Sequence, residues 1–173
     1  PQDKKYANEP TRLEIGDHNT IREFCTFNLG TAQDVGVTRV GSHNWIMAYT
    51  HIAHDCIVGS HTILANATTL AGHVTVEDYA NIGAFSGVHQ FCRIGQHAFV
   101  GPYSVIKQDV MPYSLTSLQP EVSVFGANAI GLGRRGVAKS SIEALQTALR
   151  LLTRANLNTS QAVDRIRAEV PQC

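Results

Sequence analysis

An aliphatic side chain occupies every sixth position over a long central part of the chain. The unbroken series is Val40, Ile46, Ile52, Val58, Leu64, Leu70, Val76, Ile82, Val88, Ile94, Val100 and Ile106. A fixed short period is the sequence signature of a repeat architecture. It predicts a solenoid in which each hexad forms one side and three hexads, about 18 residues, complete one triangular coil.

A second register supports a narrow, filled interior. The fourth residue after the aliphatic one is usually compact, as at Thr50, Cys56, Thr62, Thr68, Ala80, Ser86, Cys92, Ala98 and Ser104. One bulky and one compact inward position per hexad suit a parallel β-helix. We therefore expect an all-β solenoid, a parallel β-helix of hexapeptide repeats, followed by a short C-terminal α-helical region.

The repeat is interrupted once and fades near its end. It can be traced upstream through Ile15, Ile21 and Phe27 before a loop-like insertion rich in Gly and polar residues at about 29–39. After Ile106 the hexads degrade. We expect residues 1–112 to form the β-helix with its inserted loop, and residues 113–173 to form a C-terminal extended segment and α-helices.

Within the C-terminal part, residues 113–136 are expected to be irregular extended chain and loop. A helix is predicted from about Ser140, with Ser140 and Glu143 at capping-box spacing. A second is predicted from about Thr159 to Val170, stopped by Pro171. The two helices are expected to cap the open end of the solenoid. The abrupt start at Pro1 favours a fragment of a longer chain over a naturally short one.

Charge and hydropathy limit the possible partners. The 173 residues carry 14 Lys and Arg and 14 Asp and Glu, and the basic excess falls after residue 106. This excess is too small to predict nucleic-acid binding. It fits either a solvated helical face or an acidic protein partner. The sequence shows no signal peptide and no apolar run long enough to span a membrane, so we expect a cytoplasmic protein.

The cysteines are interpreted as structural. Cys56 and Cys92 share an inward register two coils apart, which places them about 9–10 Å from each other at strand spacing. That distance exceeds the reach of a disulfide. We expect both to be buried hydrophobes rather than nucleophiles, and Cys25 and Cys173 have no evident partner.

The register sorts the eight histidines. His54, His73 and His89 fall on the same side of successive coils, within about 10 Å along the axis, and His51 ends the hexad before His54. The other four, His18, His43, His61 and His97, are expected at the surface on a different side.

Three interpretations of the histidine cluster remain open from the residues alone. The side chains can be exposed corner histidines without a role. They can ligate zinc, for which histidine is a common ligand. Alternatively, His54 can be a general base that the adjacent Asp55 orients and whose charged form it stabilises.

Longer strings of residues carry a resemblance. THIAHDC (50–56), NATTLAGHV (66–74) and VHQFCRIG (88–95) resemble the UDP-N-acetylglucosamine 3-O-acyltransferase family, as do PQDKKY (1–6), EPTRLEIGD (9–17), IREFCT (21–26) and GLGRRG (131–136). The similarity covers essentially the whole chain. It implies left-handed β-helices in a homotrimer, with active sites between subunits.

The resemblance also implies an activity. A 3-hydroxyacyl group passes from acyl carrier protein to the 3-hydroxyl of UDP-N-acetylglucosamine in the first step of lipid A biosynthesis, with no cofactor or metal. His54 would be the general base, Asp55 its partner, and the Gly72 N–H the oxyanion donor. The implied substrate-binding residues are Asp3, Asn28, His51, His73, His89, Gln90, Asn128, Arg134 and Arg135.

Two positions depart from the family pattern. Asn28 stands where many members have a histidine, and it can hydrogen-bond but cannot carry a charge. Pro102 stands where some members have glycine near the end of the acyl groove, which leads us to expect a shorter acyl chain.

Three other functions remain as alternatives. The first is a zinc-dependent, carbonic-anhydrase-like enzyme on the same fold. The second is a sister acyltransferase that acylates a sugar amine. The third is an inert scaffold or binding module without catalytic activity.

Overall fold

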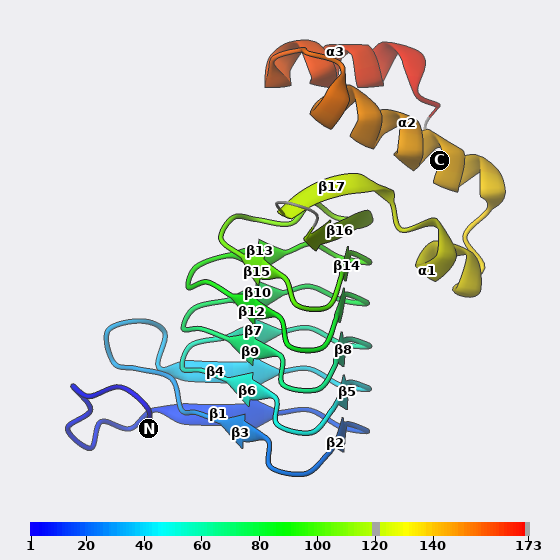
Figure 1. Ribbon diagram of the computed structural model, residues 1–173. Helices are drawn as coiled ribbons and strands as arrows, with labels where there is room; N and C mark the ends of the chain where they lie inside the picture. Colours follow the sequence, from blue (N-terminus) through cyan, green and yellow to red (C-terminus); the bar gives the residue numbers. More distant parts are fainter. Residues whose placement is uncertain (119–121, 172–173) are drawn as a thin grey trace.

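The chain folds as a triangular β-solenoid that carries helices at one end (Figure 1). The computed structural model describes residues 1–118 and 122–171. The first sheet contains β1 (Arg12–Ile15), β4 (Val37–Val40), β7 (Ile57–Val58), β10 (Thr75–Val76) and β13 (Arg93–Ile94). The third sheet contains β3 (Thr26–Phe27), β6 (His51–Ile52), β9 (Thr69–Leu70), β12 (Gly87–Val88) and β15 (Val105–Ile106).

The second sheet is the longest. It contains β2 (Thr20–Ile21), β5 (Trp45–Ile46), β8 (Ile63–Leu64), β11 (Asn81–Ile82), β14 (Phe99–Val100), β16 (Ser114–Leu118) and β17 (Val122–Ala127). All strand pairs of the solenoid are parallel, and Thr75 of β10 lies between Ile57 and Arg93 of the neighbouring coils. The coil of about 18 residues is therefore confirmed, as is the left-handed parallel β-helix.

The aliphatic residue of each hexad forms the core. Ile46, Ile52, Leu64 and Leu70 have no exposed surface, and the compact residues Cys56 and Ala80 are equally buried between them. A wider interior would leave voids beside these short strands, and protein cores do not tolerate large voids. The alternation of one large and one small inward residue therefore sets the width of the solenoid.

A residue in the left-handed backbone region turns each corner, three positions after the aliphatic residue. None of these corner residues from His43 to Tyr103 is a glycine, and their φ angles lie between 56° and 66°. Most are aromatic or histidine rings that stack on the ring one coil away. One such stack, here called the histidine–tyrosine ladder, consists of His18, His43, His61, Tyr79, His97 and Tyr113.

The segment after the repeat is more ordered than its sequence indicates. The expectation of irregular chain over residues 113–136 is wrong, because β16 pairs in parallel with β14 and β17 then pairs antiparallel with β16. A short helix, α1 (Ala129–Arg134), follows. The hairpin breaks the six-residue register, so the hexad pattern gave no signal for it.

Two longer helices complete the chain, α2 (Lys139–Arg154) and α3 (Thr159–Glu169). The predicted capping box of Ser140 and Glu143 is wrong, because the cap residue of α2 is Ala138 and it makes no side-chain cap. The helix α2 contacts β17 and α3 packs on α2, beyond the end of the solenoid (Figure 1). No described helix is long and apolar enough to cross a membrane.

The insertion is a loop between the first two coils, here called the insertion loop, residues 28–36. It is shorter than expected because β4 already begins at Val37 and pairs with β1. The cysteine expectations hold for Cys56, which is buried and unpaired, with its thiol pKa raised by burial to about 12. Cys92 is also buried and free, and Cys173 lies outside the described residues.

Candidate functional site

A histidine and a buried carboxylate form the centre of the site. His54 and Asp55 follow β6 at the corner between the third and first sheets. Nδ1 of His54 lies 2.9 Å from Oδ2 of Asp55. The Asp55 side chain has no exposed surface, whereas 24% of the His54 side chain is exposed. Because a carboxylate accepts hydrogen bonds, the proton of neutral His54 lies on Nδ1 and Nε2 keeps its lone pair.

The insertion loop holds Asp55 in place. Thr31 donates its backbone N–H to Oδ1 at 2.8 Å and its hydroxyl to Oδ2 at 2.7 Å. The backbone N–H of Asp55 donates to the hydroxyl of Thr38. Burial raises the pKa of Asp55, but the hydrogen bonds from Thr31 and His54 outweigh it, so the pKa lies below its ordinary value. Asp55 is therefore a fixed, charged partner for His54.

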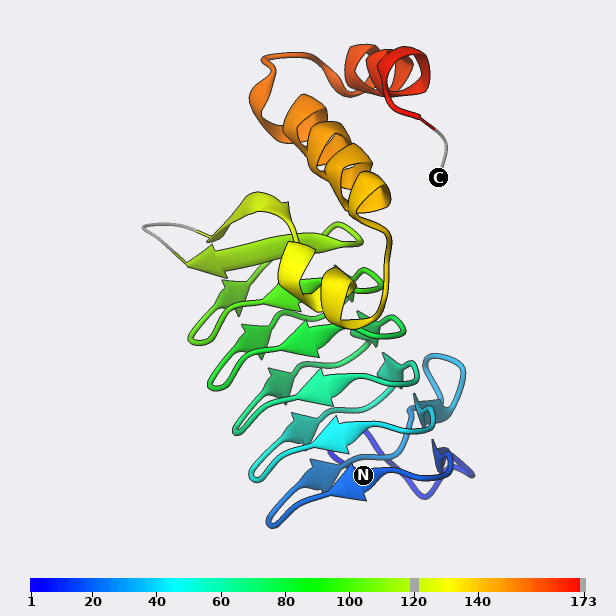
Figure 2. The same ribbon diagram turned by 90° about the vertical axis from the view of Figure 1, so that its right-hand side faces the viewer.

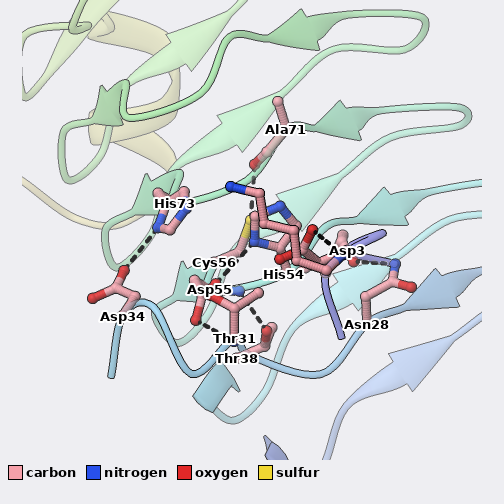
Figure 3. Close-up of polar contacts among 12 residues, drawn as sticks. Asp3, Asn28, Thr31, Asp34, Thr38, His54, Asp55, Cys56, Ala71 and His73 are labelled. Carbon is pink, nitrogen blue, oxygen red and sulfur yellow. Dashed lines mark hydrogen bonds and ion pairs between the residues drawn. The ribbon is translucent and has the colours of Figure 1, made fainter. Parts of the chain in front are cut away.

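His73 stands one coil above this pair. Its ring meets the His54 ring edge to face, with centroids 5.1 Å apart, and stacks on Phe91 at 4.5 Å. Its Nδ1 lies 2.7 Å from Oδ2 of Asp34, which belongs to the insertion loop. Figure 3 shows Asp34 and Thr31 reaching from this loop toward His73 and Asp55.

Gly72 leaves room for the His54 ring. A Cβ atom at residue 72 would lie 2.7 Å from Cε1 and 2.8 Å from Nε2 of His54, closer than real Cβ atoms come to such groups. The carbonyl of Gly72 accepts from Phe91. Within the part of the chain that the structure describes, the N–H of Gly72 meets no acceptor. An unpaired donor therefore lies beside the imidazole.

The same side chains meet a minimal geometric condition for a metal site. His54, Asp55 and His73 each offer a ligand atom, and these atoms lie within 4.8 Å of one another. In the structure, however, one nitrogen of His54 is hydrogen-bonded to Asp55 and one nitrogen of His73 to Asp34. These two hydrogen bonds therefore orient the imidazole rings of His54 and His73.

Two predicted residues, His51 in β6 and Asn28 directly after β3, lie at the N-terminal end of the third sheet. Nδ1 of His51 lies 2.7 Å from the hydroxyl of Thr26, and Nε2 contacts the amide of Gln2. Burial lowers the pKa of His51. Asn28 donates to the carbonyl of Ile52 at 3.1 Å, so it is anchored to the strand that carries His51.

Two other predicted residues follow β12, further along the third sheet, and are exposed to solvent. His89 and Gln90 are exposed, and the one polar contact recorded for the His89 side chain is 3.3 Å from Nδ1 to the carbonyl of Gln90. His89 is not part of the close group of His54, Asp55 and His73. Asp3 is half-buried and accepts the backbone N–H of Lys5.

The remaining predicted residues line a different corner. Asn128, Arg134 and Arg135 border a cavity of about 490 Å³, which Tyr79 of the histidine–tyrosine ladder also lines. Figure 2 shows α1 lying beside the outer face of the second sheet. The Arg135 guanidinium lies 4.5 Å over the ring of Tyr79. Asn128 caps α1 by accepting the N–H of Gly131 and donates to the carbonyl of His97.

Within one chain, the predicted residues therefore form two separate groups. His73 lies between β9 and β10, at the corner of the third and first sheets, whereas Tyr79 lies between β10 and β11, at the corner of the first and second sheets. The sheet formed by β7, β10 and β13 stands between the two corners. The cationic cavity and the His54 pair face different directions.

Sequence reasoning missed three contributors to these sites. Thr31 and Asp34 lie in a loop outside the six-residue register, so no pattern indicated what they touch. Tyr79 shares the corner register of His61 and His97, and that spacing is a signal that could have placed it beside them.

Family models match both parts of the chain. Residues 38–72 and 73–108 match the bacterial transferase hexapeptide model of six repeats. Residues 109–173 match the model described as domain 2 of UDP-N-acetylglucosamine O-acyltransferase. The two matches meet at the end of the solenoid, where the hexads give way to the hairpin and helices.

Individual proteins match over nearly the whole chain. An acyl-(acyl-carrier-protein)–UDP-N-acetylglucosamine O-acyltransferase from Thiobacillus denitrificans is 54% identical over 98% of this chain and 65% of the relative. One from Verminephrobacter eiseniae is 56% identical over 99% and 64%. The chain thus spans about two thirds of the length of these relatives.

Solved structures agree with the sequence matches. A UDP-N-acetylglucosamine acyltransferase from Bacteroides fragilis superposes with a TM-score of 0.96 at 39% identity, covering 100% of this chain and 67% of that one. The corresponding enzyme from Moraxella catarrhalis has a TM-score of 0.91 at 47% identity, covering 97% and 65%.

Proposed function

The chain belongs to the UDP-N-acetylglucosamine O-acyltransferase family, and from this premise we propose that it transfers a 3-hydroxyacyl group to a sugar nucleotide. The donor is acyl carrier protein, and the acceptor is the 3-hydroxyl of UDP-N-acetylglucosamine, as in the first step of lipid A biosynthesis. The reaction takes place in the cytoplasm. The observation that carries the proposal is the His54–Asp55 pair beside the unpaired N–H of Gly72.

The proposed chemistry is a direct transfer. Nε2 of His54 takes the proton of the sugar hydroxyl while its oxygen attacks the thioester carbonyl. The Gly72 N–H stabilises the oxyanion that develops on this carbonyl, a contribution typically of about 3 kcal/mol. When the intermediate collapses, the C–S bond breaks and the His54 imidazolium protonates the departing thiolate.

Asp55 and Cys56 differ in their proposed roles although they are neighbours. Asp55 keeps the proton of neutral His54 on Nδ1 and stabilises the imidazolium that forms during attack. Cys56 takes no part, because its thiol donates to the carbonyl of Ala71 and its pKa is about 12. A thiol with such a pKa holds almost no thiolate near neutral pH. No covalent acyl-enzyme is therefore needed.

A homotrimer would bring the two separated corners together. Closed cyclic symmetry repeats the same pair of surfaces around the ring, so the His54 corner of one copy can face the cavity corner of a neighbour. In that arrangement His51, His73 and Asn28 of one copy and Asn128 of the next contact the sugar nucleotide. The remaining residues predicted to bind it are Asp3, His89 and Gln90.

The cationic cavity is proposed to bind phosphate groups or the carrier. Arg134 and Arg135 supply positive charge at its rim, and acyl carrier proteins are acidic. Arginine suits phosphate recognition because its planar fork matches two oxygens at once. This role would account for the excess of basic residues in the C-terminal part of the chain.

The test is an acyl-transfer assay with UDP-N-acetylglucosamine and 3-hydroxyacyl carrier proteins of several lengths. We expect His54→Ala to reduce turnover by about a hundredfold or more. Tyr49→Ala is the matched control, because Tyr49 is a corner ring between the second and third sheets, where no proposed site lies. Equal turnover of wild type and His54→Ala would refute the proposed base. Pro102 predicts that wild type prefers a shorter donor than its Pro102→Gly variant does.

Metal analysis of the same preparations separates the zinc alternative. The close nitrogen and oxygen atoms of His54, Asp55 and His73 are the observation that favours it. One zinc ion per chain, lost together with activity in His54→Ala, would overturn the acyl-transfer proposal. Turnover that is insensitive to chelators supports it.

A further inference from the structure

The insertion loop reaches the site through two residues that have different targets. Thr31 binds Asp55, and three residues later Asp34 binds His73 (Figure 3). The Asp34 side chain is 40% exposed and that of His73 is 20% exposed, so the contact lies at the mouth of the site. None of the roles proposed above uses Asp34.

The contact fixes which nitrogen of His73 carries a proton. A carboxylate only accepts hydrogen bonds, so at 2.7 Å the proton lies on Nδ1, between the two groups. The stack on Phe91 and the edge contact with His54 fix the ring plane. Nε2 meets no hydrogen-bonding partner within residues 1–118 and 122–171. Neutral His73 therefore presents an Nε2 lone pair at the site.

We propose that Asp34 is a positioning residue, which holds His73 in the Nδ1–H tautomer so that Nε2 accepts a hydrogen bond from a hydroxyl of the sugar nucleotide. This rests on the proposed function for the identity of the substrate. It parallels the role of Asp55 toward His54, one coil below. The charged groups that face His73 are Asp34 and Asp55, and the titratable ring beside it is His54.

Three variants separate the hydrogen bond from its charge and from the shape of the loop. Asp34→Ala removes the acceptor, whereas Asp34→Asn keeps an acceptor oxygen without the charge. Gln33→Ala is the matched control, since Gln33 is the exposed neighbour in the same loop. Circular dichroism and thermal unfolding show whether each variant keeps the fold.

The first readout needs no substrate. Nitrogen-15 shifts of the imidazole rings, assigned by comparison with His73→Gln, report the tautomer of neutral His73 in the chain as it exists. We expect the Nδ1–H form in wild type, Gln33→Ala and Asp34→Asn, and a mixture or the Nε2–H form in Asp34→Ala. The same tautomer in wild type and Asp34→Ala would overturn the proposal, whether or not the chain is active.

The second readout is kinetic. We expect Asp34→Ala to raise KM for UDP-N-acetylglucosamine about tenfold with kcat changed much less, because one binding hydrogen bond is lost. Asp34→Asn should recover most of the loss. A fall in kcat at unchanged KM, or no change in either, would overturn the binding role. Failure of wild type to turn over would instead count against the proposed function and leave the tautomer result to decide the positioning.

Discussion

At the scale of single residues, the site is built by groups that hold one another rather than by unusual side chains. Asp55 is buried and accepts three hydrogen bonds, two of them from one threonine. Gly72 lets the His54 ring approach so closely that a Cβ atom on residue 72 would not fit. Substitutions of these residues should therefore change turnover and the free energy of unfolding to different extents.

Gly72→Ala tests the close approach. The added methyl must displace the His54 ring, and misplacement of a base by about 1 Å can cost a hundredfold in rate. We expect turnover to fall by at least about tenfold while the circular dichroism spectrum is kept. Gly87→Ala is the control, because a Cβ there meets nothing within 4 Å. Equal turnover in both variants would contradict the geometry.

Asp55→Asn tests the buried charge through its pH dependence. The pKa of Asp55 is lowered in the folded chain, so its charged form stabilises the fold above the ordinary carboxyl pKa of about 4. This contribution is lost as the pH falls through the lower folded pKa. In urea titrations we expect Asp55→Asn to be less stable by about 1–3 kcal/mol at pH 7. The difference should shrink toward pH 3, and a constant gap would argue against a charge effect.

At the scale of elements, the six-residue period predicts the structure of the solenoid and gives no information beyond it. The hexads predicted the strands and the core because each residue repeats the environment of the one a coil away. They gave no information on β16, β17 and α1, whose pairing depends on contacts outside the repeat.

The site was predictable to a similar extent. The register placed His54 near His73, since their hexads begin 18 residues apart, at Ile52 and Leu70, and therefore stack on neighbouring coils. The resemblance supplied the roles. Neither indicated Thr31 or Asp34, because where a loop folds back depends on tertiary contacts and not on local spacing.

The capping of α3 offers a prediction at this scale. Asn158 accepts the N–H of Gln161, and the Gln161 side chain accepts the N–H of Asn158, which satisfies two donors at the helix start. Asn158→Ala should lower the free energy of unfolding by about 1 kcal/mol. Ser160→Ala, at the second residue of the same helix, should change the free energy of unfolding much less. Chemical denaturation measures both, and equal effects would contradict the assigned cap.

At the scale of the whole molecule, the division of the proposed binding residues between two corners is the feature that favours a partner copy. His54 and its neighbours occupy one corner of the prism, and the arginine-lined cavity occupies another. Within a single chain, the sheet formed by β7, β10 and β13 separates the two corners. The central claim is therefore that one active site combines the His54 corner of one chain with the Arg135 corner of the next.

Complementation between inactive variants tests this claim most directly. His54→Ala and the double variant Arg134→Ala, Arg135→Ala are assayed separately and after co-expression as mixed trimers. Random assembly makes about one quarter of the interfaces intact on both sides, so the mixture should recover about a quarter of wild-type turnover. Turnover no higher than the mean of the two separate variants, in a mixture shown to contain both chains in one trimer, would contradict the claim.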